Sequence, residues 1–175
     1  ARSFSFSLPE GDRSVGDLRA TVTTDQYDTL YEFEIGGSHV SGEANNSGQT
    51  DFTSTLSAYP DLRVTDLAIS PASPLSGNEL TISSKDANQG TGATTGSWYN
   101  RVRVVNTTTG QTLLDTKLYH NAGTLGAIPA GGSLAKSYAV TLPNGAAGVG
   151  DLQVTVTVDR YDYLYEYETG VCHSA

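Results

Sequence analysis

Apolar and polar residues alternate in two short stretches, residues 18–24 near one end of the chain and residues 152–158 near the other. Both stretches are rich in Val and Thr, and β-branched residues that alternate with a period of two are typical of a strand with one buried face. Each stretch therefore predicts a β-strand. The positions on the apolar side are Leu18, Ala20, Val22 and Thr24 in the first stretch and Leu152, Val154, Val156 and Val158 in the second.

An aspartate-rich turn follows each predicted strand, at residues 25–28 and 159–162. Asp side chains in such turns accept hydrogen bonds from nearby backbone N–H groups. The segment beyond each turn is rich in Tyr and predicts a second strand, over 30–35 and 164–169, so that each unit is expected to be a β-hairpin. A further strand is expected before each hairpin, with apolar positions Phe4, Phe6 and Leu8 in one unit and Tyr138, Val140 and Leu142 in the other.

The two units are copies of one sequence. Gly16 aligns with Gly150, an offset of 134 residues (150 − 16), and the alignment runs without a gap over residues 3–36. By direct count, 19 of these 34 positions are identical to their partners. One architectural unit is therefore present twice, and we expect the chain to begin partway through its first copy.

The segment between the copies carries the turn signals of a domain with many short strands. Tyr59-Pro60 marks a boundary, because proline cannot donate to a strand ladder and favours an extended predecessor. Short strands separated by Gly-, Pro- and Asn-rich turns predict about seven strands between residues 61 and 170, as in a β-sandwich. The expected organisation is 1–59, the C-terminal half of a first repeat; 60–171, a near-complete second sandwich lacking its last strand; and 172–175, a tail.

Composition narrows the classes of function. Nineteen Gly and ten Tyr suit an all-β protein with many turns. No apolar run approaches the roughly 18 residues needed to span a bilayer. The net charge of −9 argues against a nucleic-acid partner, since contact with phosphates requires a basic surface. The single cysteine, Cys172, excludes an intrachain disulfide and leaves a free thiol or an intermolecular bond.

Several short motifs resemble, in their order along the chain, the bacterial CARDB family, the cell-adhesion-related domain. The motifs are residues 60–64, the Ser70-Pro71 step, residues 88–92, the Leu142-Pro143 step and the aspartate-turn-Leu-Tyr-Glu element of both copies. The family consists of Ig-like antiparallel β-sandwiches arrayed in tandem in large secreted or surface proteins. The resemblance covers residues 60–170 as a near-complete domain and residues 3–58 as the rear half of another. It implies an Ig-like sandwich located outside the cell or on its surface.

The second copy lacks a counterpart of residues 43–58, where a last strand is predicted. Two explanations are open. The chain is a segment of a longer array, or the last strand of one chain completes the sandwich of a neighbour and builds a head-to-tail polymer, because an unpaired sheet edge is a template for another strand. The residues of this intermolecular strand would be Asp51, Phe52, Thr53, Ser54, Thr55, Leu56, Ser57 and Ala58.

Acidic side chains gather at both predicted hairpins and offer a candidate calcium site. Calcium takes about six to eight oxygen ligands, which closely spaced carboxylates and turn carbonyls supply. The alternative is that the aspartates cap the turns and the glutamates face solvent, and no Asp-x-Asp-x-Asp-Gly loop is present. The candidate ligands are Asp25, Asp28, Glu32, Asp159, Asp162 and Glu166, with Glu34, Glu43 and Glu168 close by in the sequence.

Catalytic constellations are not evident in the sequence. His39, His120 and His173 fall in separate segments, and none has a His partner at metal-ligand spacing. Glu32 and Glu34 lie two apart on one predicted strand, unlike the facing carboxylates of a glycosidase. We therefore expect that the protein is not an enzyme.

Aromatic residues support a rival hypothesis, a carbohydrate-binding module. Trp98-Tyr99 and the hairpin aromatics could form a platform for sugar rings, although burial in the core is the preferred interpretation for Trp98. The hairpin aromatics are Tyr27, Tyr31 and Phe33 in the first copy and Tyr161, Tyr163, Tyr165 and Tyr167 in the second.

Together these features predict a non-catalytic, extracellular structural or adhesive repeat module, part of a surface adhesin or a head-to-tail fibre. The expected partners are neighbouring copies of the chain or of the same repeat array, with surface glycans as the alternative. Neither a nucleic-acid partner nor a membrane span is expected, and calcium is the only cofactor that the sequence suggests.

Overall fold

The computed structural model describes residues 2–33, 36 and 44–167. The chain divides into two compact units, Ala1–Ser57 and Ala58–Ala175. All strand pairs are antiparallel and no helix within the described ranges exceeds four residues, so the chain is all-β, as the alternation predicts. In this part of the chain no helix has the length and apolarity to cross a membrane.

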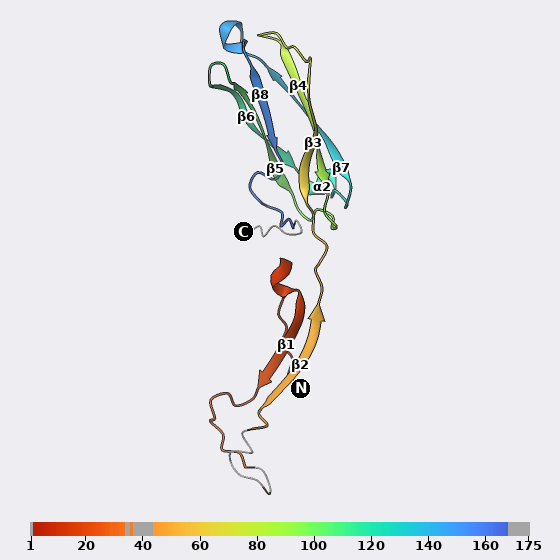
Figure 1. The fold of residues 1–175 in the computed structure, drawn as a ribbon, viewed down its shortest axis with the longest axis vertical. Helices are drawn as coiled ribbons and strands as arrows, with labels where there is room; N and C mark the ends of the chain where they lie inside the picture. Colours follow the sequence, from red (N-terminus) through yellow and green to blue (C-terminus); the bar gives the residue numbers. More distant parts are fainter. Residues whose placement is uncertain (1, 34–35, 37–43, 168–175) are drawn as a thin grey trace. The chain divides into compact units, whose positions relative to one another are not determined.

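The second unit is a sandwich of two three-stranded sheets that face each other (Figure 1). One sheet has the strand order β3-β4-β7 and the other has the order β6-β5-β8. The bounds are β3 (Leu62–Ser70), β4 (Glu79–Asn88), β5 (Trp98–Asn106), β6 (Gln111–His120), β7 (Ser133–Thr141) and β8 (Leu152–Thr157), with a short helix α2 (Ala122–Leu125) and a 3-10 turn η2 (Gly145–Gly148).

Two apolar clusters fill the interior of the sandwich. Leu80 and Ile82 of β4 pack with Val102 and Val104 of β5, because alternate positions of a strand point to the same face. The second cluster contains Trp98, which is fully buried, as expected from the sequence. Removal of this apolar surface from water is the main stabilising contribution to the unit.

The first unit contains a 3-10 turn η1 (Gly11–Ser14) and a two-stranded sheet of β1 (Gly16–Thr23) and β2 (Ser47–Ser54). Of its described residues, only Gly11 is buried. A two-stranded sheet without a covered face is at best marginally stable in water. The first unit therefore has little buried apolar surface of its own to stabilise it.

The sequence repeat is visible in the backbone. η1 and η2 occupy matching positions at the offset of 134 residues, and β1 matches β8. The φ angles of the turn aspartates also match: 42° for Asp25 and 38° for Asp159, 51° for Asp28 and 52° for Asp162. The aligned segments thus share one local structure, a 3-10 turn followed by a strand and an aspartate turn.

The predicted hairpin is wrong in both copies. Residues 29–33 and 163–167 form no strand, because the first N–H groups beyond each turn donate to the turn aspartate and not to a ladder. The partner of β1 is β2 instead. β2 begins and ends four residues before the strand predicted at 51–58, so residues 55–58 lie outside any strand.

The strand predicted before β1 is also wrong. Residues 4–8 form no strand, although most of their counterparts belong to β7. A ladder to β4 holds β7 in place, and the described residues of the first unit include no counterpart of β4. Phe4 and Phe6 are consequently 89% and 65% exposed. The second unit has six strands in its described part, and not about seven, because the segment after its aspartate turn does not pair.

Candidate functional site

The turn aspartates Asp25 and Asp159 cap the backbone of the two copies. The Asp25 carboxylate accepts hydrogen bonds from the N–H groups of Thr29 (2.9 Å) and Leu30 (2.7 Å). The Thr29 hydroxyl and these two N–H groups hold the pKa of Asp25 below its ordinary value. Asp159 repeats the geometry, and its two oxygens accept N–H groups at 3.1 and 2.8 Å. The structure therefore shows both aspartates as caps of their turns.

The other candidate calcium ligands do not converge on these caps. Asp28 and Asp162 close their turns through backbone N–H groups, which donate to the carbonyls of Asp25 and Asp159 at 2.9 and 3.1 Å, and Glu32 is half-buried. Within the described ranges, no group of three or more His, Cys, Asp or Glu side chains is placed to hold a metal ion. Glu34, Glu43 and Glu168 lie outside the described residues, as does Cys172. Calcium binding stays a prediction.

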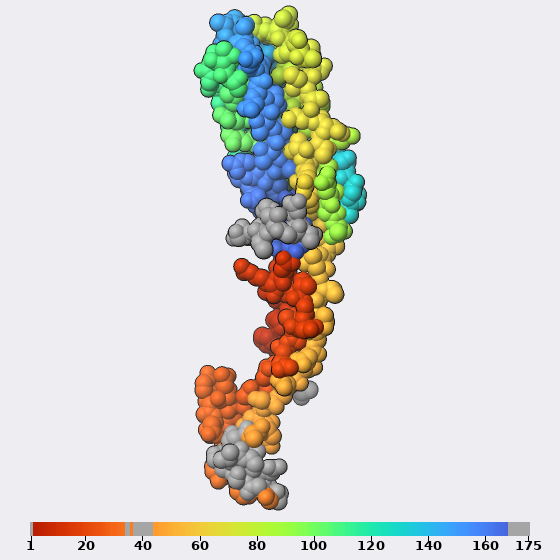
Figure 2. Space-filling model, in the orientation of Figure 1, coloured from red at the N-terminus to blue at the C-terminus, as the bar shows by residue number. Residues whose placement is uncertain are grey.

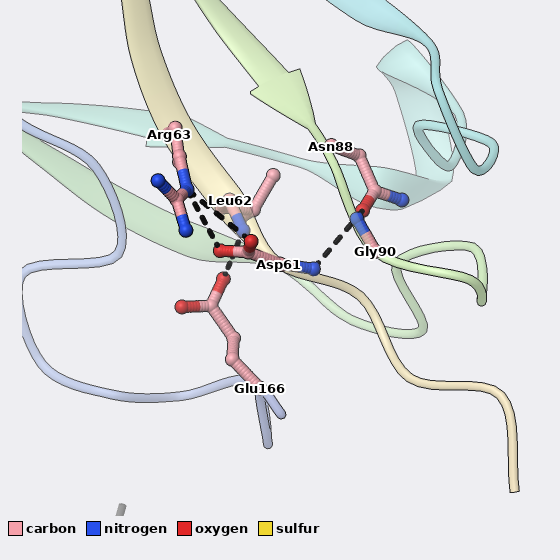
Figure 3. A network of polar contacts seen from close by, with 6 residues as sticks. All are labelled: Asp61, Leu62, Arg63, Asn88, Gly90 and Glu166. Carbon is pink, nitrogen blue, oxygen red and sulfur yellow. Dashed lines mark hydrogen bonds and ion pairs between the residues drawn. The ribbon is translucent and has the colours of Figure 1, made fainter. Parts of the chain in front are cut away.

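Glu166 lies against the first residues of β3 (Figure 3). Its Oε1 accepts the N–H of Leu62 at 2.9 Å. Partial burial raises the pKa of Glu166 to about 7; the Leu62 N–H opposes this rise, and the nearby carboxylates of Asp159, Asp61 and Asp162 add to it. A carboxyl group that titrates near neutrality thus connects the segment after β8 to the start of the sandwich.

Asn88 holds the chain where it enters the sandwich. Its buried side-chain oxygen accepts the N–H groups of Asp61 (3.0 Å) and Gly90 (3.1 Å) (Figure 3). Its amide nitrogen donates to the carbonyls of Gly92 (2.8 Å) and Ile128 (3.0 Å). Both donors and both acceptor positions of the amide are used, so the side chain is fully satisfied in the interior.

Two glycines let the incoming chain lie against this loop. A Cβ at Gly92 would be 2.5 Å from the carbonyl oxygen of Ala58, and one at Gly90 would be 2.3 Å from that of Tyr59. Any larger residue would push the backbone of residues 58–62 away. We call residues 58–62, held by Asn88 and the two glycines, the anchoring segment. In the sequence, residues 88–92 stand out only as one of the motifs that resemble the CARDB family. The signal that could have revealed their structural role is an Asn close to two glycines.

Four tyrosines form an exposed cluster on the second unit. Tyr99 lies 4.7 Å from Tyr119 and 6.2 Å from Tyr163 between ring centroids, and Tyr161 lies 5.7 Å from Tyr163. Tyr119, Tyr161 and Tyr163 are between 41% and 59% exposed. The ammonium group of Lys117 is 4.8 Å from the centre of the Tyr161 ring, within cation–π range. We call these four residues the tyrosine cluster.

The tyrosines of the second copy do not all join one aromatic platform. Tyr165 and Tyr167 pack with Tyr59, at 5.1 and 5.8 Å between ring centroids. The split arises because this segment is not a strand, so alternate residues need not point to one side. Only Tyr161 and Tyr163 join the exposed cluster.

Ionisable groups also occur in the interior, around His120. Asn100 donates to both oxygens of Asp86 at 2.8 Å, and the ammonium group of Lys136 is 3.2 Å from His120 Nδ1 and 3.8 Å from Asp86. The His120 ring stacks on Trp98 at 3.7 Å between centroids. Burial raises the pKa of Asp86 and lowers the pKa of His120. Asp86 and His120 are fully buried, which shields them from any substrate; His39 and His173 lie outside the described residues.

A groove lies at the outer edge of β8, beside the first residues of that strand. β8 pairs with β5 on one side, and in the described part of the chain no strand pairs with its other side, the open edge. Figure 2 shows β8 (blue) beside β3 (yellow), and the groove between them has a volume of about 730 Å³. We call it the β8 groove; the larger apolar side chains in its lining are Ile69, Leu75, Leu80, Val149, Leu152 and Val154.

Comparisons of the chain with protein-family models, with curated proteins and with solved structures found no match. The features that bear on function are therefore the repeat in the backbone, the anchoring segment, the tyrosine cluster and the β8 groove.

Proposed function

We propose that the chain is a non-catalytic structural repeat module of an extracellular adhesin or fibre, built from Ig-like sandwiches of the kind the CARDB resemblance suggests. The observation that carries the proposal is the repeat in the backbone, in which η1, β1 and the Asp25 turn recur as η2, β8 and the Asp159 turn. Proteins built from repeated units gain stability from each unit and from its contacts with neighbours.

The directions of the strands support modules arranged in series. β3 starts at Leu62, which is bonded to Glu166, so the described chain enters and leaves the second unit at the same end. In the first unit β2 follows β1 in the antiparallel direction. A β2-like strand paired with the open edge of β8, from this chain or from a neighbour, would therefore run to the opposite end of the sandwich. A module completed in this way is entered at one end and left at the other, which a serial array requires.

The anchoring segment supports a role under tension. The N–H groups of Gln89 and Gly92 donate to the carbonyls of Asp61 (2.7 Å) and Tyr59 (2.8 Å), in addition to the contacts of Asn88. A pulling force applied to the chain before β3 would have to break these bonds together, because they hold neighbouring residues of one short segment.

Two measurements test the proposal. When the chain is stretched between its two ends, the second unit should unfold in one event that lengthens the chain by about 35 nm, the extended length of residues 62–164. Antibodies against the chain should label intact source cells. A gradual extension without a resolved event contradicts a module that bears force, and labelling that requires permeabilised cells contradicts an extracellular one.

The tyrosine cluster favours carbohydrate binding as the second candidate function. Its exposed rings offer apolar faces with polar rims, and Lys117 adds a hydrogen-bond donor beside them. A glycan array and a pull-down with insoluble polysaccharide test this function. Binding that is lost in Tyr161→Ala and Tyr163→Ala but kept in Tyr27→Ala, at the position that matches Tyr161 in the first copy, would establish it. A chain that binds no glycan on either assay is not a lectin for the sugars tested.

A further inference from the structure

We propose that the open edge of β8 binds the β2 strand of a second copy of this chain, in the register that β2 shows on β1, with Phe52 placed in the β8 groove. The inference deepens the proposed function, because it names the contact through which one copy would join another. It depends on three observations: the direction of the hydrogen bonds, the register of the repeat and the groove.

Hydrogen-bond direction shows which edge of β1 is occupied by β2. The N–H of Thr24 donates to the carbonyl of Asn46 at 2.8 Å, one step beyond the pair Thr23 and Ser47. In an antiparallel ladder, directly opposed residues alternate between bonded and non-bonded pairs. The even-numbered residues of β1 therefore direct their N–H and C=O groups toward β2.

In β8, the direction of the hydrogen bonds shows that the odd-numbered residues face the paired strand, the opposite of β1. The N–H of Thr107 donates to the carbonyl of Asp151 at 2.8 Å, one step before the pair Leu152 and Asn106. The odd-numbered residues of β8 therefore bond to β5, and the even-numbered ones direct their backbone groups to the open edge. These even-numbered residues are the counterparts, 134 positions on, of the β1 residues that bond to β2. The open edge of β8 thus corresponds to the edge that β2 covers in the first unit.

The register places an aromatic side chain in the groove. Phe52 lies opposite Leu18 in the first unit, and directly opposed residues point to the same face. The counterpart of Leu18 is Leu152, which lines the β8 groove next to Val154. A β2 strand in the same register on β8 would therefore bring Phe52 against Leu152, between the two sheets.

Two of three side-chain contacts of β2 would be kept after the transfer. Thr53 donates to Asp17 at 2.9 Å, and Asp17 corresponds to Asp151; the Ser47 hydroxyl is 3.0 Å from that of Thr23, which corresponds to Thr157. The third contact, the ion pair of Arg19 with Asp51, would be lost, because Gln153 takes the place of Arg19. Arg19 is 59% and Asp51 65% exposed, and exposed pairs contribute little to stability.

Moving β2 from β1 to β8 would bury more apolar surface and lose few contacts. On β1, Phe52 is 40% exposed, and no described residue of this two-stranded sheet is fully buried. On β8 it would contact Leu152 and the other side chains of the groove, among them Leu75 and Val149, which are 68% and 60% exposed as they stand. The backbone ladder keeps its register, although β8 spans six residues and β1 spans eight. The gain from the exchange therefore comes from the apolar contact.

Disulfide trapping tests the register. Four single-cysteine chains are prepared in a Cys172→Ser background: Asp51→Cys and Ser47→Cys in β2, and Gln153→Cys and Thr157→Cys in β8. Each β2 variant is mixed with each β8 variant under mild oxidation, with one chain tagged so that heterodimers differ in mass. Residue 51 should trap 153 and residue 47 should trap 157, since both are opposed, non-bonded pairs whose Cα separation of about 4.5 Å suits a disulfide.

The two crossed mixtures are the matched controls, because their cysteines would lie about 13 Å apart along the strand. We expect at least a tenfold excess of heterodimer in the in-register mixtures. Equal yields in all four mixtures would overturn strand addition in this register, and so would the absence of heterodimer. Either result leaves the structural-module proposal standing, because that proposal is tested separately by stretching and surface labelling.

The same disulfide-trapped pairs of chains test whether the incoming β2 strand occupies the β8 groove. Leu75→Asp in the β8 chain should reduce the in-register yield at least fivefold, whereas Leu125→Asp, equally drastic on an exposed residue of α2 outside the groove lining, should not. A synthetic peptide of residues 45–58 should suppress trapping, and the same peptide with Phe52→Ser should not. Trp98 fluorescence establishes that the second unit of each β8 chain is folded before mixing. Trapping that is insensitive to both Leu75→Asp and the peptide excludes the groove as the binding site.

Discussion

The backbone N–H of Leu62 donates a 2.9 Å hydrogen bond to the carboxyl group of Glu166, which is 104 residues away in the sequence. Leu62 is the first residue of β3, and Glu166 lies in the segment that follows β8. The bond joins the beginning and the end of the described sandwich, and Asn88 and its two glycines hold the adjacent residues.

Stability should depend on pH through Glu166. Its pKa is about 7 in the folded chain against an ordinary value of 4.5, so between these values the folded state holds a proton that the unfolded state releases. The contribution is fully present below pH 4.5, declines as the pH rises through this window and is lost above about 7. Because the side chain is only partly buried, we expect a loss of about 1 kcal/mol. Urea midpoints at pH 5 and pH 8, read by Trp98 fluorescence, measure it.

Glu166→Gln supplies the control for this titration. The amide oxygen can still accept the N–H of Leu62, but it carries no charge, so the variant should be more stable than the parent at pH 8 and similar to it at pH 5. His120 acts in the opposite direction, because its pKa is lowered by burial and stability is lost as the pH falls below its ordinary value of 6.5. The His120 contribution is the same in both chains, so it cancels in the difference between their free energies of unfolding at each pH. An identical pH slope in both chains would contradict the assignment to Glu166.

Asn88→Ala should destabilise the second unit by about 2–4 kcal/mol. The substitution removes four hydrogen bonds and leaves buried backbone groups without partners. Gln89→Ala, at the exposed neighbouring position, should change the free energy of unfolding by less than about 0.5 kcal/mol. Urea unfolding of both variants checks this, and comparable losses would show that Asn88 has no special role.

Gly92→Ala should loosen the anchoring segment. The added methyl group would lie 2.5 Å from the carbonyl oxygen of Ala58, so the backbone has to move and the hydrogen bond from the Gly92 N–H to Tyr59 is weakened. We expect a loss of about 1–3 kcal/mol and faster exchange of the Asp61 amide hydrogen, which the anchoring segment donates to Asn88. Gly48→Ala is the matched control, since a Cβ at Gly48 meets nothing within 4 Å. Unchanged exchange in the Gly92 variant would mean that the loop yields without releasing the segment.

The two turn aspartates should differ in their effect on stability although their contacts match. Asp159 is 5% exposed, and Asp159→Ala would leave the N–H groups of Tyr163 and Leu164 without their acceptor, at a cost of about 2 kcal/mol. Asp25→Ala acts in the first unit and should leave the unfolding reported by Trp98 unchanged. Equal shifts in the two variants would indicate that the first unit contributes to the stability of the second.

Calcium provides a separate test of the same turns. Because both carboxylate oxygens of Asp159 already accept backbone N–H groups, we expect the melting temperature of the parent chain to be the same in calcium and in a chelator. A rise with calcium that disappears in Asp162→Asn would instead establish the acidic turns as a calcium site.

Structural features that depend on residues close together in the chain could be predicted from the sequence. The strands β1 and β8 follow from alternation with a period of two, and the caps of Asp25 and Asp159 follow from bonds that span only four or five residues. The repeat alignment also predicted that both segments would adopt one local structure, and their φ angles agree within a few degrees. Each of these depends on interactions between residues that are close in the chain, so composition and spacing suffice to specify them.

Tertiary structure decided which segments pair and which side chains meet. The tyrosine-rich segment has the composition of a strand, yet its first N–H groups are taken by the turn aspartate, and β2 pairs with β1 in its place. The contact of Glu166 with Leu62, the split of the tyrosines into two groups and the groove beside β8 all join residues far apart in the sequence. The β-strand propensities of the residues favour several strand pairings about equally. The choice among them depends on which backbone groups find partners and which apolar faces are covered once the two sheets have packed together.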